Sequence, residues 1–327
     1  MKTLIIYCYA ESVQTKNNLM FFIKNGIILS DDYYYVFIIN DNQCTVNFPS
    51  YNNIKVLYRN ENENDLYTYK WYINNTQDDY FLEYSYFYFI NSSCIGPFLP
   101  PICTNNWIDL MNIHLNKYSL IGPIAEIPLD NKYTNDLNVD DSKNIPFIHS
   151  YMFAVNSFGF KIIKYVFDNM LSNKKQYALD AERQITMYNL KNGGKIKSFL
   201  VRFQHVDLNN PDNWNFNKFN LLNKPPCYEV PNNYFGIDIN PFEIIFVKNI
   251  RNQNESRDAQ FAGISETLKL YINRYKDWIN NEFIVDNKED SILENFIENQ
   301  QDNISYSKLI LLFFLICIII YFIKNKK

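Results

Sequence analysis

The sequence has few of the residues on which tight phosphate loops and metal sites depend. It contains 8 glycines and 3 histidines in 327 residues. No GxGxxG follows the first apolar run, because the stretch 7–12 (Tyr-Cys-Tyr-Ala-Glu-Ser) offers no glycine for close approach to a pyrophosphate. A Rossmann-type oxidoreductase is therefore poorly supported.

Cysteine pairs and an excess of positive charge are also missing. The six cysteines are scattered without CxxC or CxxH spacing, so the sequence predicts neither a zinc site nor a disulfide framework, and a reducing compartment fits best. Lys and Arg number 31 against 35 Asp and Glu, a net charge of -4. Such a chain has no basic field for a phosphate backbone, and we expect no nucleic-acid partner.

Apolar and aromatic residues, by contrast, are plentiful. Hydrophobic residues make up 47% of the chain, with 26 Tyr and 26 Phe, which is enough to fill one large domain or two modest ones. A wholly disordered protein is excluded. A large excess of Asn accompanies them, so a single Tyr or Asn carries little functional weight by its identity alone.

Short apolar runs alternate with helical patterns from the N-terminus onward. The expected strands are 3–9, 34–40, 54–58, 84–91, 119–121, 151–155 and 196–201, and the expected helices are 12–26, 66–73, 107–115, 158–171 and 178–191. Polar loops are expected at 130–144 and 209–240. The alternation predicts an α/β fold with a mainly parallel sheet flanked by helices.

Ligands of open α/β sheets lie beyond the carboxyl ends of the strands, so the turns there are the candidate site. These turns are residues 9–12, 40–42, 59–65 and 91–97. We expect them to converge on one crevice that contains Asp65, Asn91 and Glu182.

The C-terminal part differs in composition from the rest. Residues 252–307 are charged and helical in pattern and predict a stalk, and residues 308–324 predict a transmembrane helix followed by a basic tail at 325–327. The apolar run is short, so a buried core helix is the alternative, although its residues are apolar on every face. The N-terminus does not resemble a signal peptide. The sequence thus predicts a single-pass, tail-anchored membrane protein whose domain, residues 1–251, faces the cytosol.

The most specific turn is the one after the expected strand 84–91. Its residues, Phe89-Ile90-Asn91-Ser92-Ser93 followed by Gly96-Pro97-Phe98-Leu99-Pro100, resemble the "F-x-N-S-S-x-x-G-P-F-L-P" signature of a family of GT-A-like glycosyltransferases. This family occurs in large DNA viruses, algae and bacteria and is related to rhamnan-synthesis proteins.

Further blocks extend the resemblance, in order, over roughly residues 3 to 251. They are Asn18-Leu19, Arg59 with Asp65, Lys117 with Leu120 to Pro123, Pro146 to Ala154, Glu182 to Ile196, and Tyr234 to Arg251. The chain departs from the family pattern at Phe147 and His149, which replace the usual His and Gln. The stalk and the anchor lie outside the resemblance, which otherwise implies a GT-A-like fold with a viral, host-membrane or virion context.

The activity that the resemblance implies is transfer of a hexose or deoxyhexose from a nucleotide-sugar donor to a hydroxyl of a glycan, protein or lipid. Such chemistry needs a nucleotide pocket, a positive partner for the leaving diphosphate and often a carboxylate base. Asn91-Ser92-Ser93 stands at the position where metal-dependent GT-A enzymes have Asp-x-Asp. Amide and hydroxyl oxygens bind Mg²⁺ or Mn²⁺ weakly. The substitution argues against a metal cofactor.

Candidate roles follow from these needs, and each has a structural alternative. Glu182 is the candidate general base, or a favourable charge near a helix N-terminus. Asp65 is a donor ligand or a helix N-cap, and Arg59 contacts either the diphosphate or a neighbouring carboxylate. The remaining candidate donor-binding residues are Tyr9, Asn91, Ser92, Ser93, His149, His205 and Lys248.

A second hypothesis is a catalytically inactive relative that keeps the fold as a membrane or virion-associated binding or structural protein. The missing Asp-x-Asp favours it. Retention of Asp65, Glu182 and the block from Asn91 to Pro100 opposes it.

Overall fold

The computed structural model describes residues 1–61, 63–100, 102–128, 144–170, 178–214, 239–249 and 270. The chain divides into two compact units, Met1–Ile272 and Asn273–Lys327, and every described residue belongs to the first. The predicted stalk, anchor and tail (252–327) lie outside the described residues, apart from Leu270. Within the described part, no helix combines the length and apolar character needed to cross a bilayer.

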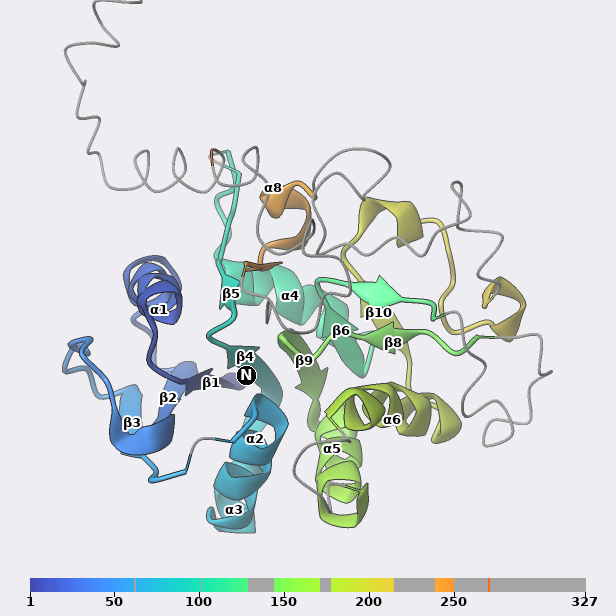
Figure 1. The fold of residues 1–327 in the computed structure, drawn as a ribbon. Coiled ribbons are helices and arrows are strands. Elements are labelled where there is room, and N and C mark those ends of the chain that lie inside the picture. Colours follow the sequence, from blue (N-terminus) through green and yellow to red (C-terminus); the bar gives the residue numbers. More distant parts are fainter. Residues whose placement is uncertain are drawn as a thin grey trace, which may run out of the picture. The chain divides into compact units, whose positions relative to one another are not determined.

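A mixed seven-stranded sheet forms the centre of the first unit (Figure 1). Its strand order is β10-β6-β9-β4-β1-β2-β3, and β9 runs antiparallel to both of its neighbours while the other pairs are parallel. The strands are β1 (Lys2–Tyr9), β2 (Tyr33–Ile39), β3 (Ile54–Tyr58), β4 (Tyr84–Asn91), β6 (Leu120–Gly122), β9 (Met152–Asn156) and β10 (Ile196–Ser198). The predicted mainly parallel α/β sheet is confirmed.

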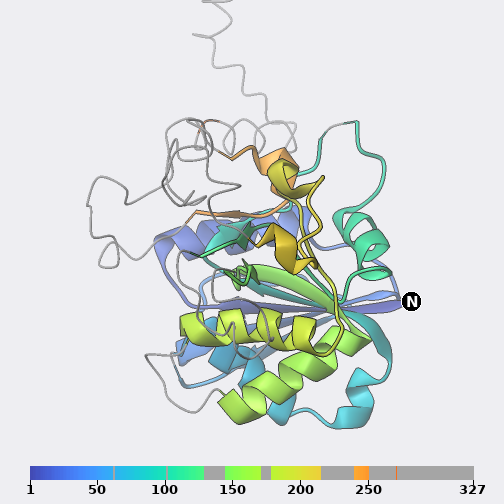
Figure 2. The same ribbon diagram turned by 90° about the vertical axis from the view of Figure 1, so that its right-hand side faces the viewer.

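Helices cover both faces of this sheet (Figures 1 and 2). One face carries α1 (Val13–Asn25) and α4 (Trp107–Leu115), and the other carries α2 (Asp65–Asn74), α3 (Asp78–Phe81), α5 (Ser157–Met170) and α6 (Ala178–Lys191). Because both faces are covered, β1 and β4 are apolar almost throughout instead of alternating with polar residues.

Aromatic residues on β4 show how the two faces are filled. Successive side chains of a strand point to opposite faces, and Phe87 stacks on Phe160 of α5 with ring centroids 3.9 Å apart. Tyr88 points the other way, where its hydroxyl donates to Asn112 of α4 at 2.7 Å and its ring meets Trp107 edge-on. The many Tyr and Phe residues are therefore mainly core residues.

Local signals set several element ends. Ser12 caps α1, because its hydroxyl accepts the Thr15 N–H at 3.1 Å. Helix α2 is capped by Asn64, whose side chain accepts the Tyr67 N–H at 3.1 Å. The N-cap of α2 is therefore Asn64 and not Asp65, the cap that the sequence suggested. The Asp65 carboxylate can take another role.

Two small antiparallel sheets lie beside the main one. In the first, β5 (Cys94–Ile95) pairs with β11 (Val247–Lys248), which follows the short helix α8 (Pro241–Ile244). In the second, β7 (Ala125–Glu126) pairs with β8 (Phe147–Ile148). Both pairs join segments that are distant in the sequence, and both carry candidate site residues.

Candidate functional site

The switch in strand order falls between β1 and β4, because the chain runs outward from β1 through β2 to β3 and then returns to the other side of β1 with β4. Cys8 of β1 is in register with Asn91 of β4. A switch of this kind leaves a place for a ligand beyond the carboxyl ends of the two strands. The predicted turns after β1 and β4 do meet there.

Asp65 and Asn91 are in direct contact at this point. The Asn91 amide donates to Asp65 Oδ2 at 2.5 Å, and the Leu66 N–H donates to Oδ1 at 3.0 Å. Burial raises the pKa of the Asp65 carboxyl above its usual 3.8, against the opposing effects of Asn91, the Leu66 N–H and the charge of Lys248. Asp65 is thus a desolvated carboxylate at the switch point.

The turn after β4 is held closed by its own side chains. Asn91 Oδ1 accepts the N–H of Ser93 at 3.0 Å and its hydroxyl at 2.5 Å. Ser92 is buried, and its N–H donates to the Cys8 carbonyl at 3.0 Å. These bonds fix the conformation of the turn, and the contact between Asn91 and Asp65 links the turn to α2.

A buried pair of amides fixes this turn to β11. The Asn18 side chain, fully buried on α1, donates to the Ser92 carbonyl at 2.9 Å and to Asn249 Oδ1 at 2.6 Å. Asn249 returns a bond to Asn18 Oδ1 at 2.7 Å, and its backbone N–H donates to the Ser93 carbonyl at 3.0 Å. The residue before Asn249 is Lys248, so the pair sets where that lysine lies.

Lys248 connects the two candidate carboxylates. Its pairing with Cys94 across β11 and β5 puts its side chain near the turn after β4. Its positive charge favours the ionised form, and so lowers the pKa, of both Asp65 and Glu182. One ammonium thus acts on two desolvated carboxylates that come from different helices.

Glu182 accepts a backbone bond from the segment after β8. Its Oε1 accepts a short hydrogen bond from the Ser150 N–H, and Thr186, one turn later on α6, accepts the Ile148 N–H at 3.0 Å. Residues four apart share a helix face, which is why α6 can hold two alternate N–H groups of this extended segment. Burial raises the pKa of Glu182 above its usual 4.5, with His149, the Ser150 N–H and Lys248 opposing.

His149 lies between two carboxyl groups. Its Nε2 is 3.1 Å from Glu126 Oε2 at the end of β7, and its ring stacks on Phe147. When protonated, its imidazolium lowers the pKa of Glu182. The two residues that depart from the family pattern, Phe147 and His149, therefore pack on each other beside the candidate base.

Tyr9 and Arg59 are engaged with neighbouring side chains. The Tyr9 hydroxyl donates to Glu11 at 2.7 Å. The buried Arg59 guanidinium contacts Glu61 at 2.5 Å and Glu63 at 2.9 Å and donates to Thr68 at 3.1 Å. Of the two roles that the sequence left open for Arg59, the structure contains the contact with carboxylates.

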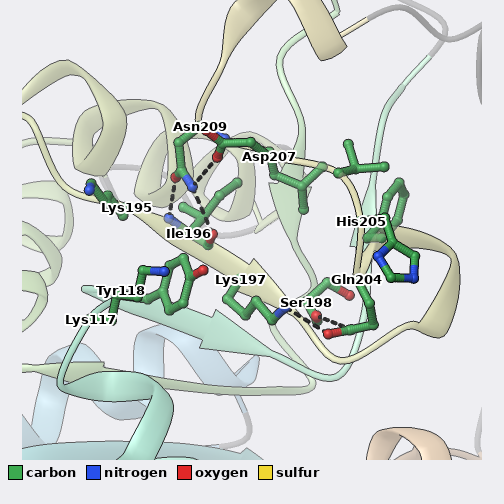
Figure 3. A pocket seen from close by; sticks show the side chains of 13 residues that line it. Lys117, Tyr118, Lys195, Ile196, Lys197, Ser198, Gln204, His205, Asp207 and Asn209 are labelled. Carbon is green, nitrogen blue, oxygen red and sulfur yellow. Dashed lines mark hydrogen bonds between the residues drawn. The ribbon is translucent and has the colours of Figure 1, made fainter.

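His205 is not brought to the switch point. It lines a pocket on β10, the edge strand at the opposite end of the sheet from β3 (Figure 3). Hydrogen bonds and charge interactions link Asp65, Asn91, Ser93, Lys248, Glu182 and His149 in one group, whereas His205 lies in the lining of the pocket at β10.

The donor set at the Asp-x-Asp position does not fit a divalent cation. Asn91 Oδ1 accepts two hydrogen bonds from Ser93, its amide nitrogen cannot ligate a metal, and Asp65 is the one carboxylate in contact with it. In the part of the chain that the structure describes, no three His, Cys, Asp or Glu side chains are grouped so as to hold a metal. We derive no step through a metal.

Three residues that hold this group in place were not predicted as site residues from the sequence. Asn18 matched a family block without a role, and Asn249 and Glu126 were not singled out. These residues are identified only by pairing between segments that are distant in the sequence. Helix α1 pairs with the segment after β11, and β7 pairs with β8. Neither periodicity nor spacing within one segment reveals such pairing.

Comparisons with known proteins do not identify a family for this chain. No family model matches the sequence, and no curated protein matches it. One solved structure similar to this chain is the mannosyltransferase PcManGT from Pyrobaculum calidifontis in complex with GDP-Man and Mn²⁺, at 9% identity and a TM-score of 0.36. The match covers 60% of this chain and 54% of that one, so the chain spans about half the length of the structure it matches. A likeness this small supports no functional conclusion.

Proposed function

We propose that this protein is a glycosyltransferase that moves a sugar from a nucleotide-sugar donor to a hydroxyl group. The observation that carries the proposal lies beyond the carboxyl ends of β1 and β4, where Asp65 bonds to Asn91 and the charge of Lys248 lowers the pKa of both Asp65 and Glu182. Two desolvated carboxyls with raised pKa that share one lysine are costly to fold, and such arrangements cluster at functional sites. The motif resemblance then selects glycosyl transfer among the possible reactions.

On this proposal the donor contacts the turn after β4. Asp65 accepts hydrogen bonds from the ribose or base, and Asn91 holds Asp65 in place through its amide. Ser92 and Ser93 shape the turn against which the donor lies. Lys248 supplies the positive charge for the leaving diphosphate, a role for which a lysine ammonium is suited as a point charge.

Glu182 takes the proton of the attacking hydroxyl. As the carbon–oxygen bond to the sugar forms, the hydroxyl proton moves to the Glu182 carboxylate and the bond to the diphosphate breaks. A carboxylate whose pKa is raised is a better base near neutral pH than an ordinary one. His149 orients the base from the Glu126 side. This role suits an inverting transferase, in which acceptor and leaving group lie on opposite sides of the sugar.

The other predicted donor residues take supporting roles in the proposal. Tyr9 and Arg59 stiffen the turns after β1 and β3 through Glu11, Glu61 and Glu63. His205 is given no role in donor binding on this proposal, because it lines the pocket at β10.

The cellular setting is proposed from the sequence. Residues 308–324 would anchor the chain in a membrane, and 252–307 would hold the domain, 1–251, at a distance from the lipid on the cytosolic side. A viral origin, in a host membrane or a virion, is proposed from the family resemblance.

The proposal is tested with the full-length chain and a panel of UDP-, GDP- and dTDP-sugars. We expect slow donor hydrolysis with one of them and a rise in Tm with the matching nucleoside diphosphate. Asp65→Asn should lose both signals. Asp78→Asn is the matched control, because Asp78 is an exposed aspartate on α3 that contacts Lys164.

The inactive binding protein remains the second candidate, favoured by the internal bonding of Asn91 and by the poor metal donor set. A nucleotide-induced rise in Tm without turnover of any donor would support it. No turnover and no rise in Tm with any nucleotide would contradict the glycosyltransferase proposal.

A further inference from the structure

A pocket lies beside the edge strand β10 (Figure 3). Its volume is about 380 Å³, within the range of small-molecule sites. It is lined by the segment before β6, by the residues around β10 and by the loop that returns along that strand. Since β10 is an edge strand, one wall of the pocket is this loop and not another strand.

The neutral polar side chains of the loop are used to hold that wall. Asn209 bonds both backbone groups of Ile196, accepting its N–H at 2.6 Å and donating to its carbonyl at 3.3 Å. Gln204 donates to the carbonyls of Ser198 at 3.0 Å and Leu200 at 2.9 Å. The wall is therefore fixed to the sheet edge, as the dashed bonds in Figure 3 illustrate, and the pocket is preformed.

Positive charge dominates the lining. The lining includes three lysines, Lys117, Lys195 and Lys197, and one carboxylate, Asp207, which accepts hydrogen bonds from Asn209 at 3.0 and 2.9 Å. The Lys197 ammonium donates to Gln204 Oε1 at 2.6 Å. Within the described part of the chain, no hydrogen bond or ion pair engages the ammonium groups of Lys117 and Lys195. The chain as a whole is acidic, so this local excess of cations is not a consequence of composition.

The lysines are held close enough to affect one another. Both Lys117 and Lys197 lie over the ring of Tyr118, with their ammonium groups 5.5 and 6.0 Å from its centroid. Burial lowers the pKa of Lys197, and the charge of Lys117 lowers it further. A bound anion would relieve this repulsion.

We propose that this pocket binds a small phosphate monoester, carried either by a sugar phosphate or by a lipid phosphate headgroup. Three lysines and one aspartate leave an excess of two positive charges, which matches a phosphate monoester of charge near −2 better than a single carboxylate. The inference is independent of the proposed donor site, which lies on other strands.

Calorimetric titration of the full-length chain at low ionic strength tests the proposal. Glucose 6-phosphate is one probe, dihexanoyl phosphatidic acid is the lipid probe and glucose is the uncharged control. We expect binding of at least one phosphate, no binding of glucose, and weaker binding as salt is raised. The stronger of the two phosphates identifies the source.

Charge-removing variants assign the binding to this pocket. The double variant Lys117→Gln, Lys195→Gln should bind phosphate at least about tenfold more weakly, because it removes at least one charge-assisted contact. Both lysines are exposed, so the fold should persist. The matched control is Lys55→Gln with Lys161→Gln, two exposed lysines on β3 and α5, which should bind as the wild type does.

Three results would overturn the proposal. They are no binding of either phosphate by the wild type, equal binding by the Lys117→Gln, Lys195→Gln variant, and loss of binding in Lys248→Gln, which would assign the phosphate to the donor site. Retained binding in Lys248→Gln supports two separate sites, whether or not the chain transfers sugars.

Discussion

Two cations at the same end of the sheet have different surroundings. After β3, Arg59 contacts Glu61 and Glu63 at 2.5 and 2.9 Å, and its charge is fully matched within the turn. At the turn after β4, the charge of Lys248, a residue of β11, lowers the pKa of Asp65 and Glu182. Burial has the larger effect and keeps the pKa of both carboxyls above its usual value. The first arrangement stabilises a turn. In the second, desolvation outweighs the favourable charge of Lys248 and leaves two carboxyls with raised pKa, as is common at functional sites.

The largest expected difference between the two regions is in catalysis. Glu182→Gln should lower the transfer rate by about 10²- to 10⁴-fold, the usual contribution of a general base. Glu61→Gln, in the Arg59 turn, should leave the rate nearly unchanged. Steady-state kinetics of both variants with the active donor measures this. Equal rates for Glu182→Gln and wild type would remove Glu182 from the mechanism.

The next difference is in stability. Arg59→Ala should lower the free energy of unfolding by about 2–4 kcal/mol, because it leaves Glu63, with a side chain 15% exposed, without its cation. Urea denaturation followed by circular dichroism measures the change. Donor binding by the folded variant should persist. A loss below about 0.5 kcal/mol would show that the pair behaves as an ordinary surface ion pair.

Lys248→Gln should have the opposite profile, with affinity lost and the fold kept. We expect nucleoside diphosphate to bind about tenfold more weakly, since one charge-assisted contact to phosphate is removed. Lys248→Arg keeps the charge and should recover part of the affinity. Titration with the diphosphate and with the corresponding nucleoside separates the phosphate contact from the base contact. If the nucleoside loses as much affinity as the diphosphate, Lys248 acts on structure and not on phosphate.

The smallest expected effect is on the pH dependence of stability. The pKa of Glu182 is raised above 4.5 in the folded chain, so the folded state holds this proton more tightly than the unfolded state. Stability therefore falls as pH rises from about 4.5 through the folded pKa, and the cost persists above it. Glu182→Gln lacks this cost, so its Tm relative to wild type should increase between pH 4.5 and 8. A constant difference in Tm across that range would contradict the raised pKa.

Local patterns in the sequence predicted the elements well. The strands 54–58 and 84–91 and the helices 107–115 and 178–191 were predicted to the residue. Each is defined by an apolar run or a helical repeat with a clear stop signal, such as the glycines after Lys191. The predicted strand 196–201 ends instead at Ser198, because the Ser198 hydroxyl accepts the Leu200 N–H and a helical turn begins at Val201.

The sequence predicted only part of the candidate site, because only some of its contacts follow from the order of the strands. Asp65 follows β3 and Asn91 ends β4, so the rule for parallel strands places both at the same edge of the sheet. The position of Lys248 depends instead on β11 pairing with β5 and on the Asn18–Asn249 amides. His205 lies in a loop whose course is set by the bonds of Asn209 to the edge of β10, and no local pattern in the sequence reveals those bonds.

The reciprocal amides of Asn18 and Asn249 also bear on how the chain acquires its native state. They join a helix made at the start of synthesis to a segment made more than two hundred residues later, the two asparagines being separated by 231 positions. Contacts of such high sequence separation form late, because a long loop must close before they contribute any stability. A nascent chain that has emerged only as far as α6 would hold the helix and β4 but not the lysine, so ligand affinity should be acquired in the last stage of folding.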